Sequence, residues 1–228
     1  MIEASGVTHR YGDHPGARTV LADVDVRLDE QRIGIVGANG SGKSTFARML
    51  NGLVLPTAGR VSVDGLDTRR EGREVRRRVG FCFTDPDAQI VMPTVAEDVA
   101  FGLRRRGLSK DDVRARVEAA LAAYGLAGHA DHPAHLLSGG QKQLLALASV
   151  LVTEPTLLVM DEPTTLLDLR NAQMIGRAVA ELPQQVVLVT HHLELLDGFD
   201  RVLVFDEGRL VEDDVPRSAV TSYQRLMA

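Results

Sequence analysis

The chain has 228 residues, of which 44% are hydrophobic and 25% charged, values typical of a globular protein with one sizeable core. At about 150 residues per domain, this length accommodates one large domain or one domain with an inserted subdomain. Its net charge of -5 argues against a nucleic-acid backbone as the main partner. The longest apolar run, residues 144–152, is far shorter than the roughly 20 residues that span a bilayer, so we expect another chain to supply any membrane-embedded part.

A glycine-rich loop follows a short β-type run at residues 32–36. The loop reads Gly37-Ala38-Asn39-Gly40-Ser41-Gly42-Lys43-Ser44 and matches G-x-x-x-x-G-K-S, the P-loop pattern. Apolar residues at 46, 49, 50 and 53 then have helical spacing, so the loop joins a strand to a helix. Backbone N–H groups and Lys43 in such a loop bind phosphate, and the Ser44 hydroxyl is a ligand for Mg²⁺. We predict nucleotide binding by Gly37, Asn39, Gly40, Ser41, Gly42, Lys43, Ser44 and Thr45.

The remaining patterns predict an α/β fold. Residues 157–160 and 186–189 are apolar at every position, as in parallel strands covered on both faces, and a helical stripe at 175–182 lies between them. Residues 202–205 and 209–211 flank a turn and predict a hairpin. The middle of the chain instead shows helical patterns, such as the run from Ser109 to Tyr124 that begins with a capping box. We therefore expect a parallel sheet with an inserted helical subdomain.

Two acidic residues follow the apolar run at 157–160. Asp161 and Glu162 would lie at the carboxyl end of a buried strand, which is where open α/β sheets bind ligands. Asp161 suits coordination of Mg²⁺, and Glu162 suits activation of a water molecule for attack on the terminal phosphate. An acidic pair that only ends a strand before Pro163 is the alternative, which the nearby P-loop disfavours.

A second candidate phosphate site is Leu137-Ser138-Gly139-Gly140-Gln141, which we call the signature motif. Ser138 is a favourable N-cap, and the two glycines leave backbone N–H groups open to an anion. An ordinary capped helix start is the competing interpretation. The apolar face of the predicted helix continues at residues 144, 147, 148 and 151.

The P-loop, the signature motif and the run DEPTTLLD at residues 161–168 together resemble the nucleotide-binding subunit of an ABC ATPase over nearly the whole chain. The resemblance implies a P-loop NTPase (RecA-like) parallel sheet core with an antiparallel β subdomain and an inserted helical subdomain. We assign residues 1–84 and 153–228 to the core and 85–152 to the helical signature subdomain. ATP and Mg²⁺ are the implied ligands.

In that family the signature motif contacts ATP held on the P-loop of the opposite subunit, so the resemblance implies a head-to-tail dimer, either a homodimer or a heterodimer. The contacts would come from Ser138, Gly139, Gly140 and Gln141. His191 matches the switch histidine that contacts the terminal phosphate and orients Glu162. Tyr11 matches the aromatic residue that stacks on adenine, and Asp168 matches the loop aspartate that crosses the dimer interface.

A narrower resemblance comes from Pro86-Asp87-Ala88-Gln89 and the segment at 93–102. Both are similar to the ATPases of energy-coupling-factor importers, which take up vitamins and cobalt or nickel ions; a biotin importer is the nearest match. The resemblance implies an integral membrane partner and a peripheral position on the cytoplasmic face of the inner membrane. The alternatives are a Pro-punctuated linker for this segment, and for the protein a soluble ABC ATPase of DNA repair or translation, or an exporter subunit.

Two positions depart from the family pattern. Thr84 stands where most members have a glutamine that reaches Mg²⁺ and the attacking water, so Thr84, Asp85 or Gln89 is expected to take over that contact. His192 replaces the aspartate that commonly follows the switch histidine. The basic run at 69–78 predicts an exposed helix of mixed charge, and residues 104–106 are expected to face lipid headgroups or an acidic partner helix.

Overall fold

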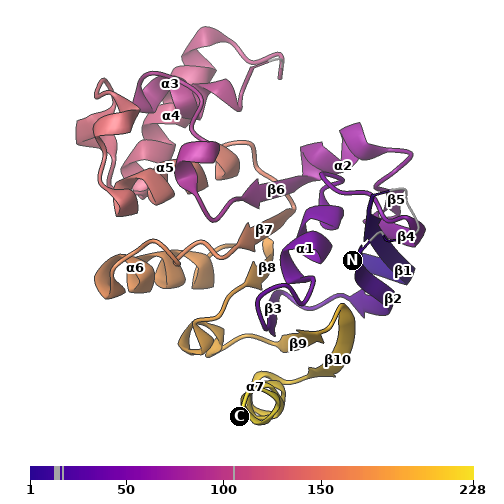
Figure 1. Cartoon of the computed structure of the whole chain (residues 1–228). Coiled ribbons are helices and arrows are strands. Elements are labelled where there is room, and N and C mark those ends of the chain that lie inside the picture. The colour runs from indigo at the N-terminus through magenta and orange to yellow at the C-terminus, as the bar shows by residue number, and fades with distance from the viewer. Residues whose placement is uncertain (13–15, 17, 105) are drawn as a thin grey trace.

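The computed structural model describes residues 1–12, 16, 18–104 and 106–228. Figure 1 shows two sheets and a group of helices arranged along one chain. The strands are β1 (Ile2–Tyr11), β2 (Arg18–Leu28), β3 (Arg32–Gly37), β4 (Ala58–Val63), β5 (Leu66–Asp67), β6 (Val79–Cys82), β7 (Leu157–Asp161), β8 (Gln185–Val189), β9 (Arg201–Asp206) and β10 (Arg209–Asp214). The α-helices are α1 (Lys43–Leu50), α2 (Gly72–Arg78), α3 (Val95–Phe101), α4 (Lys110–Ala123), α5 (Gly139–Leu151), α6 (Leu169–Ala180) and α7 (Pro216–Leu226). Single 3₁₀ turns are η1 (Pro86–Ala88), η2 (Ala127–His129), η3 (Ala134–Leu136) and η4 (Leu193–Leu196).

The larger sheet has six strands in the order β10-β9-β3-β8-β7-β6. All neighbouring pairs are parallel except β9 and β10, which form the predicted hairpin. Alternate residues of β7 enter two different cores: Leu158 and Met160 pack with the helical part, and Leu157 and Val159 pack with α1. Because both faces are covered, the central strands are apolar at every position, as predicted.

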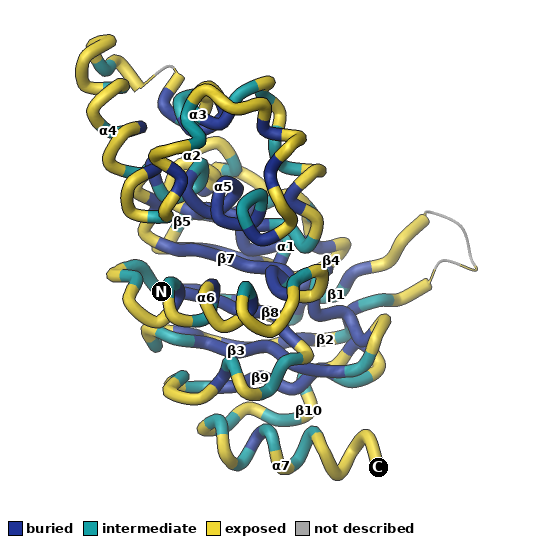
Figure 2. Tube along the Cα trace, turned by 90° about the vertical axis from the view of Figure 1, so that its left-hand side faces the viewer, coloured by how far each residue is buried: buried dark blue, intermediate teal, exposed yellow. Residues whose placement is uncertain are grey.

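The smaller sheet is antiparallel, with the strand order β2-β1-β4-β5. It lies against α1 on the same side of the large sheet, and its buried residues Ile2, Val24 and Val61 share one core with Phe46. The predicted fold class, a parallel sheet with an antiparallel β subdomain and an inserted helical part, is confirmed. In both views α3 and α4 lie at one end of the molecule and α7 at the other (Figures 1 and 2).

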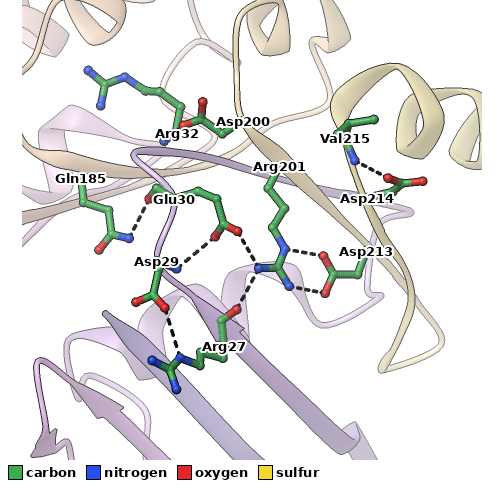
Figure 3. A network of polar contacts seen from close by, with 10 residues as sticks. All are labelled: Arg27, Asp29, Glu30, Arg32, Gln185, Asp200, Arg201, Asp213, Asp214 and Val215. Carbon is green, nitrogen blue, oxygen red and sulfur yellow. Dashed lines mark hydrogen bonds and ion pairs between the residues drawn. The ribbon is translucent and has the colours of Figure 1, made fainter.

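Arg201 joins the start of β9 to both sheets (Figure 3). Its guanidinium makes a two-point contact with Asp213 on β10, at 2.5 and 2.6 Å, and donates to Glu30 Oε1 and to the carbonyl of Arg27, both at 2.9 Å. Asp213, assisted by Glu30, raises the pKa of Arg201. Since Glu30 lies in the turn before β3, this network fixes the strand that leads into the P-loop.

The helices of the structure can be compared with the helices that the sequence predicts. The helix after the P-loop is shorter than the apolar spacing predicted: α1 ends at Leu50, because Gly52 adopts a φ of 71°, and Leu53 is 49% exposed beyond it. The basic run contains α2, on which only Val75 is buried, so an exposed charged helix is confirmed. Within the described residues, no helix has the length and apolarity needed to cross a bilayer.

Candidate nucleotide-binding site

The P-loop occupies the junction of β3 and α1, and its glycines are sterically required. A Cβ on Gly37 would lie 2.1 Å from the carbonyl oxygen of Phe205, and one on Gly42 would lie 2.7 Å from that of Val20. Gly42 also has a φ of 102°, which favours glycine. As the N-cap of α1, Gly42 contributes no side-chain acceptor, so the first N–H groups of this helix remain open to an anion.

Lys43 folds back over the loop. Its Nζ donates to the carbonyls of Gly37 and Ala38, at 2.7 and 2.9 Å, and the side chain is buried. Burial lowers the pKa of Lys43, while the charges of Glu162 and Asp161 act in the opposite direction. The ammonium is therefore held by neutral carbonyl groups and retains its capacity for an anionic ligand.

Asp161 ends β7 and is buried, with its carboxylate divided between two residues of α1. Ser44 Oγ donates to Oδ1 at 2.7 Å, and Arg48 Nη2 contacts Oδ2 at 3.2 Å. The contact between Ser44 and Asp161 joins the two residues that the sequence assigned to one metal. Arg48 was not predicted, although its position four residues after Ser44 places it on the same helix face.

Glu162 follows with a φ of 53°, an uncommon value for a glutamate that marks local strain at this turn. Its Oε2 lies 2.7 Å from His191 Nδ1 and also accepts from the His191 backbone N–H and from Thr165 Oγ1, both at 3.3 Å. The carboxylate can only accept, so His191 Nδ1 carries the donated proton. The predicted pair of Glu162 and His191 is therefore in direct contact.

A cavity of about 330 Å³ brings together most of the predicted P-loop residues with Tyr11 and Glu162. It is lined by Tyr11, Arg18, Val20, Asn39, Gly40, Gly42, Lys43, Ser44, Thr45 and Glu162. Tyr11 is 51% exposed and contacts His9 edge to face, with the ring centroids 4.6 Å apart. Sequence reasoning missed Arg18, which no motif contains. Gly37 and Ser41 lie in the same loop, outside this lining.

The three candidates for the missing glutamine lie outside that lining. Thr84 Oγ1 donates to the backbone carbonyl of Asp161 at 2.7 Å, and Asp85 accepts from the N–H of Asp87. Gln89 uses both ends of its amide: Oε1 accepts from the N–H of Phe83, and Nε2 donates to the carbonyl of Ala146 on α5. Gln89 therefore ties β6 to the helical part in this structure, and Thr84 is the candidate nearest to Asp161.

The signature motif lies at the start of α5, away from the cavity lining. Ser138 and Gln141 form a reciprocal capping box, with Ser138 and Gly139 both exposed. A Cβ on Gly140 would lie 2.5 Å from the side chain of Asn171, so the start of α6 packs closely here. Asp168 caps α6 by accepting from the N–H of Asn171 at 2.8 Å.

Two features around the signature motif were missed by sequence reasoning. The Gln141 amide contacts His129 Nε2 at 3.1 Å, and His129 Nδ1 lies 2.7 Å from His132 Nδ1. Three exposed leucines also border this region, Leu136, Leu166 and Leu169, at 71%, 64% and 70% exposure. Patches of this kind mark contact surfaces in soluble proteins.

The fold and these motifs define a nucleotide-binding ABC cassette. The profile of the ABC transporter family matches residues 21–165, more than half of the chain, so the protein belongs to this family and is an ATP-binding ATPase.

Two relatives match along the whole chain. It is 50% identical over 228 residues to the biotin transport ATP-binding protein BioM of Rhizobium etli, covering 100% of this chain and 99% of the relative. It is 46% identical over 239 residues to the energy-coupling factor transporter ATP-binding protein EcfA1 of Symbiobacterium thermophilum, covering 100% of this chain and 83% of the relative.

Solved structures agree. The structure of cbiO1 from Clostridium perfringens, part of the ABC transporter complex cbiONQ, matches with a TM-score of 0.84 and 30% identity. The match covers 99% of this chain and 92% of the cbiO1 chain. The dimeric post-hydrolysis structure of the ATP-binding cassette MJ0796, bound to ADP and Pi, matches with a TM-score of 0.83 and 28% identity. The match covers 95% of this chain and 99% of the MJ0796 chain.

Proposed function

We propose that this chain is the ATP-hydrolysing subunit of an importer of the energy-coupling-factor type, working as a dimer on a membrane partner. The single observation that carries its enzymatic part is the contact of His191 with Glu162 at the wall of the cavity that Lys43 and Ser44 also line. This arrangement sets a general base beside a phosphate site.

The residues divide the work as follows. The open N–H groups at the start of α1 and the Lys43 ammonium bind the phosphates of ATP, and the exposed face of Tyr11 stacks on the adenine. The Glu162 carboxylate takes the proton of the attacking water, because it lines the cavity and, unlike Asp161, is not engaged by Arg48 of α1. His191 holds that carboxylate in place through its Nδ1–H.

Mg²⁺ fits the donor set at the base of the cavity. Ser44 Oγ and Asp161 Oδ1 are two oxygen donors 2.7 Å apart, and a hydroxyl with a carboxylate is the oxygen chemistry that Mg²⁺ selects. These two residues would hold the ion, which neutralises charge on the phosphates when bound. Thr84, hydrogen-bonded to the Asp161 carbonyl, supports this edge from the next strand.

We further propose that the active form is a head-to-tail dimer. Ser138 and Gly139 of the signature motif are exposed, and the motif lies outside the cavity lining and is bordered by three exposed leucines. This start of α5 is therefore accessible to a second chain. The dimeric form of MJ0796, to which this chain is similar, supports the same assembly. Since the chain carries both halves of the site, a homodimer suffices, and a heterodimer with a related ATPase is the alternative.

Import rather than export is supported by residues 86–102 and by the BioM and EcfA1 relatives, and biotin is the substrate that the first of these favours. The partner is then an integral membrane protein on whose cytoplasmic face this chain lies. Exposed Val91 and Phe101, with Arg104 stacked 4.8 Å from the Phe101 ring centroid, form the proposed docking surface. Of the basic residues expected there, Arg105 lies outside the described residues.

Glu162→Gln tests the enzymatic proposal. The amide keeps the size of the side chain and removes the base, so we expect ATP binding to be retained, hydrolysis to fall by about 100-fold or more, and an ATP-bound dimer to accumulate. Glu181→Gln, at the far end of α6, is the matched control and should behave as wild type. Unchanged hydrolysis by Glu162→Gln would exclude this residue as the base.

The transport assignment is tested by purifying the tagged protein from membranes and identifying what accompanies it. We expect integral membrane proteins with the wild type, and their loss with Val91→Glu and Arg104→Glu, with basal hydrolysis intact. A few central contacts usually dominate such interfaces, so these two substitutions suffice. A wild-type protein that never associates with membranes would instead favour a soluble ABC machine.

A further inference from the structure

His192 is the residue for which the family pattern gave no physical account, and the structure places it in contact with the catalytic pair. The inference below rests on the proposed roles of Glu162 and His191. Glu162 Oε2 and His191 Nδ1 lie 2.7 Å apart, but the His191 side chain is 50% exposed. This one hydrogen bond therefore does not fix the plane of the His191 ring.

The backbone of His192 is held at both ends. Its N–H donates to Thr190 Oγ1 at 3.0 Å, and its carbonyl accepts from the N–H of Leu195 at 3.0 Å, where the turn η4 begins. Thr190 is fully buried, and its own N–H donates to the backbone carbonyl of Ile35 on β3. The direction in which the His192 side chain leaves the backbone is therefore set by the central sheet.

The side chain is held as well. His192 Nδ1 lies 3.2 Å from Glu194 Oε1, and since a carboxylate only accepts, this nitrogen carries the donated proton. The His192 ring then lies against that of His191, with the centroids 4.3 Å apart and the planes tilted by 38°. One face of the exposed catalytic histidine is thus covered by a ring that has its own anchor.

We propose that His192, anchored by Glu194, is a positioning residue that keeps the His191 ring turned with Nδ1 on Glu162. A chain of contacts then runs from Glu194 through His192 and His191 to the general base. An aspartate at position 192 has no ring with which to cover His191, so this protein orients its switch histidine by stacking.

The consequence for the reaction is a defined proton position. The proton on Nδ1 is directed to Glu162, so the general base keeps one fixed hydrogen-bond donor. A ring that turns freely moves Nδ1 away from Glu162 and so releases the carboxylate for part of the time. Because ATP is bound mainly by the P-loop, the loss should appear in kcat and not in KM.

Four variants of the full-length protein test this with MgATP as the substrate. His192→Ala and His192→Asp remove the ring, and we expect kcat to fall about fivefold with KM unchanged, in line with the strength of an aromatic pair. His192→Phe keeps the ring but loses its bond to Glu194, so its kcat should match that of Glu194→Gln, within about twofold of wild type. Both should lie between wild type and His192→Ala, and Asp197→Asn, which removes an exposed carboxylate just after η4, is the matched control.

A spectroscopic readout separates positioning from a general loss of stability. In ¹⁵N-histidine NMR spectra of the wild type, His191 should show a single tautomer with its proton on Nδ1. His192→Ala should show a mixture of tautomers, and His192→Phe should restore the single form.

Retention by His192→Ala of both wild-type kcat and a single His191 tautomer would overturn the inference, and so would a folded His192→Phe as impaired as His192→Ala. Failure of the proposed function is recognised separately, because Glu162→Gln would then still hydrolyse ATP.

Discussion

The P-loop and the signature motif both place glycines at the start of a helix, yet the structure equips them differently. Around the P-loop, Ser41, Lys43 and Thr45 are buried, and the N-cap of α1 is a glycine without a side-chain acceptor. In the signature motif Ser138 and Gly139 are exposed, and Ser138 and Gln141 already cap each other. A buried, uncapped helix start leaves N–H groups for a ligand within the chain, whereas we propose that the exposed Ser138 and Gly139 serve a ligand held by a second chain.

Lys43→Ala gives the largest expected effect, because it removes the full positive charge from the P-loop, which we propose binds ATP within one chain. We expect the affinity for ATP to fall about 100-fold and hydrolysis to be lost, as measured by calorimetry and phosphate release. Lys110→Ala, an exposed lysine at the start of α4, serves as the control. Wild-type affinity in Lys43→Ala would contradict the assignment of the P-loop.

Gly139→Asp should separate binding from hydrolysis. The added carboxylate repels phosphate at the signature motif, so hydrolysis and ATP-dependent dimer formation should fall by about 100-fold, while the isolated chain binds ATP within about twofold of wild type. Gly128→Asp is the matched control, since Gly128 lies outside the signature motif and a Cβ there would have no neighbour within 4 Å. Loss of ATP binding by the isolated Gly139→Asp chain would show that both motifs serve one site in one chain.

Gln89→Ala tests how the two regions are joined. It leaves the N–H of Phe83 and the carbonyl of Ala146 without their partner, so the free energy of unfolding should drop by about 1–2 kcal/mol in urea titrations. The side chain lies outside the cavity lining, so the affinity for ATP should not change. If Gln89→Ala keeps the wild-type unfolding midpoint but binds ATP more weakly, then Gln89 contributes to the nucleotide-binding site and not to the contact between β6 and α5.

The smallest expected effect is a change in how often the contact between β6 and α5 opens in the folded protein. The reactivity of Cys82, the last residue of β6, measures this opening. Burial raises the pKa of its thiol to about 12, with Gln89 acting in the opposite direction, so reaction with a thiol reagent at pH 8 should be slow. Labelling should be several-fold faster in Gln89→Ala, where α5 separates from β6 more often. Equal labelling rates would mean that Gln89 does not hold this junction.

The sequence predicted the elements whose signals are local. The strands at 157–160 and 186–189, the P-loop and the capped start of α5 are each specified by a few adjacent residues. The contacts it missed join distant segments: Arg48 reaches Asp161, His129 reaches Gln141, and no spacing rule relates these positions. The extent of α1 was overestimated because Leu53 has the right spacing but follows Gly52, which ends the helix.

We propose that each ATP site is completed by two chains, and a mixture of two inactive variants distinguishes this arrangement from a site within one chain. In a head-to-tail dimer of Glu162→Gln with Gly139→Asp, one site receives both defects and the other receives none. Each heterodimer then has one intact site, so the mixture should regain hydrolysis that neither variant shows alone, reaching about one quarter of the wild-type rate where pairing is random. A mixture no more active than its separate components would contradict a site shared by two chains, because it would place both motifs in a site within one chain.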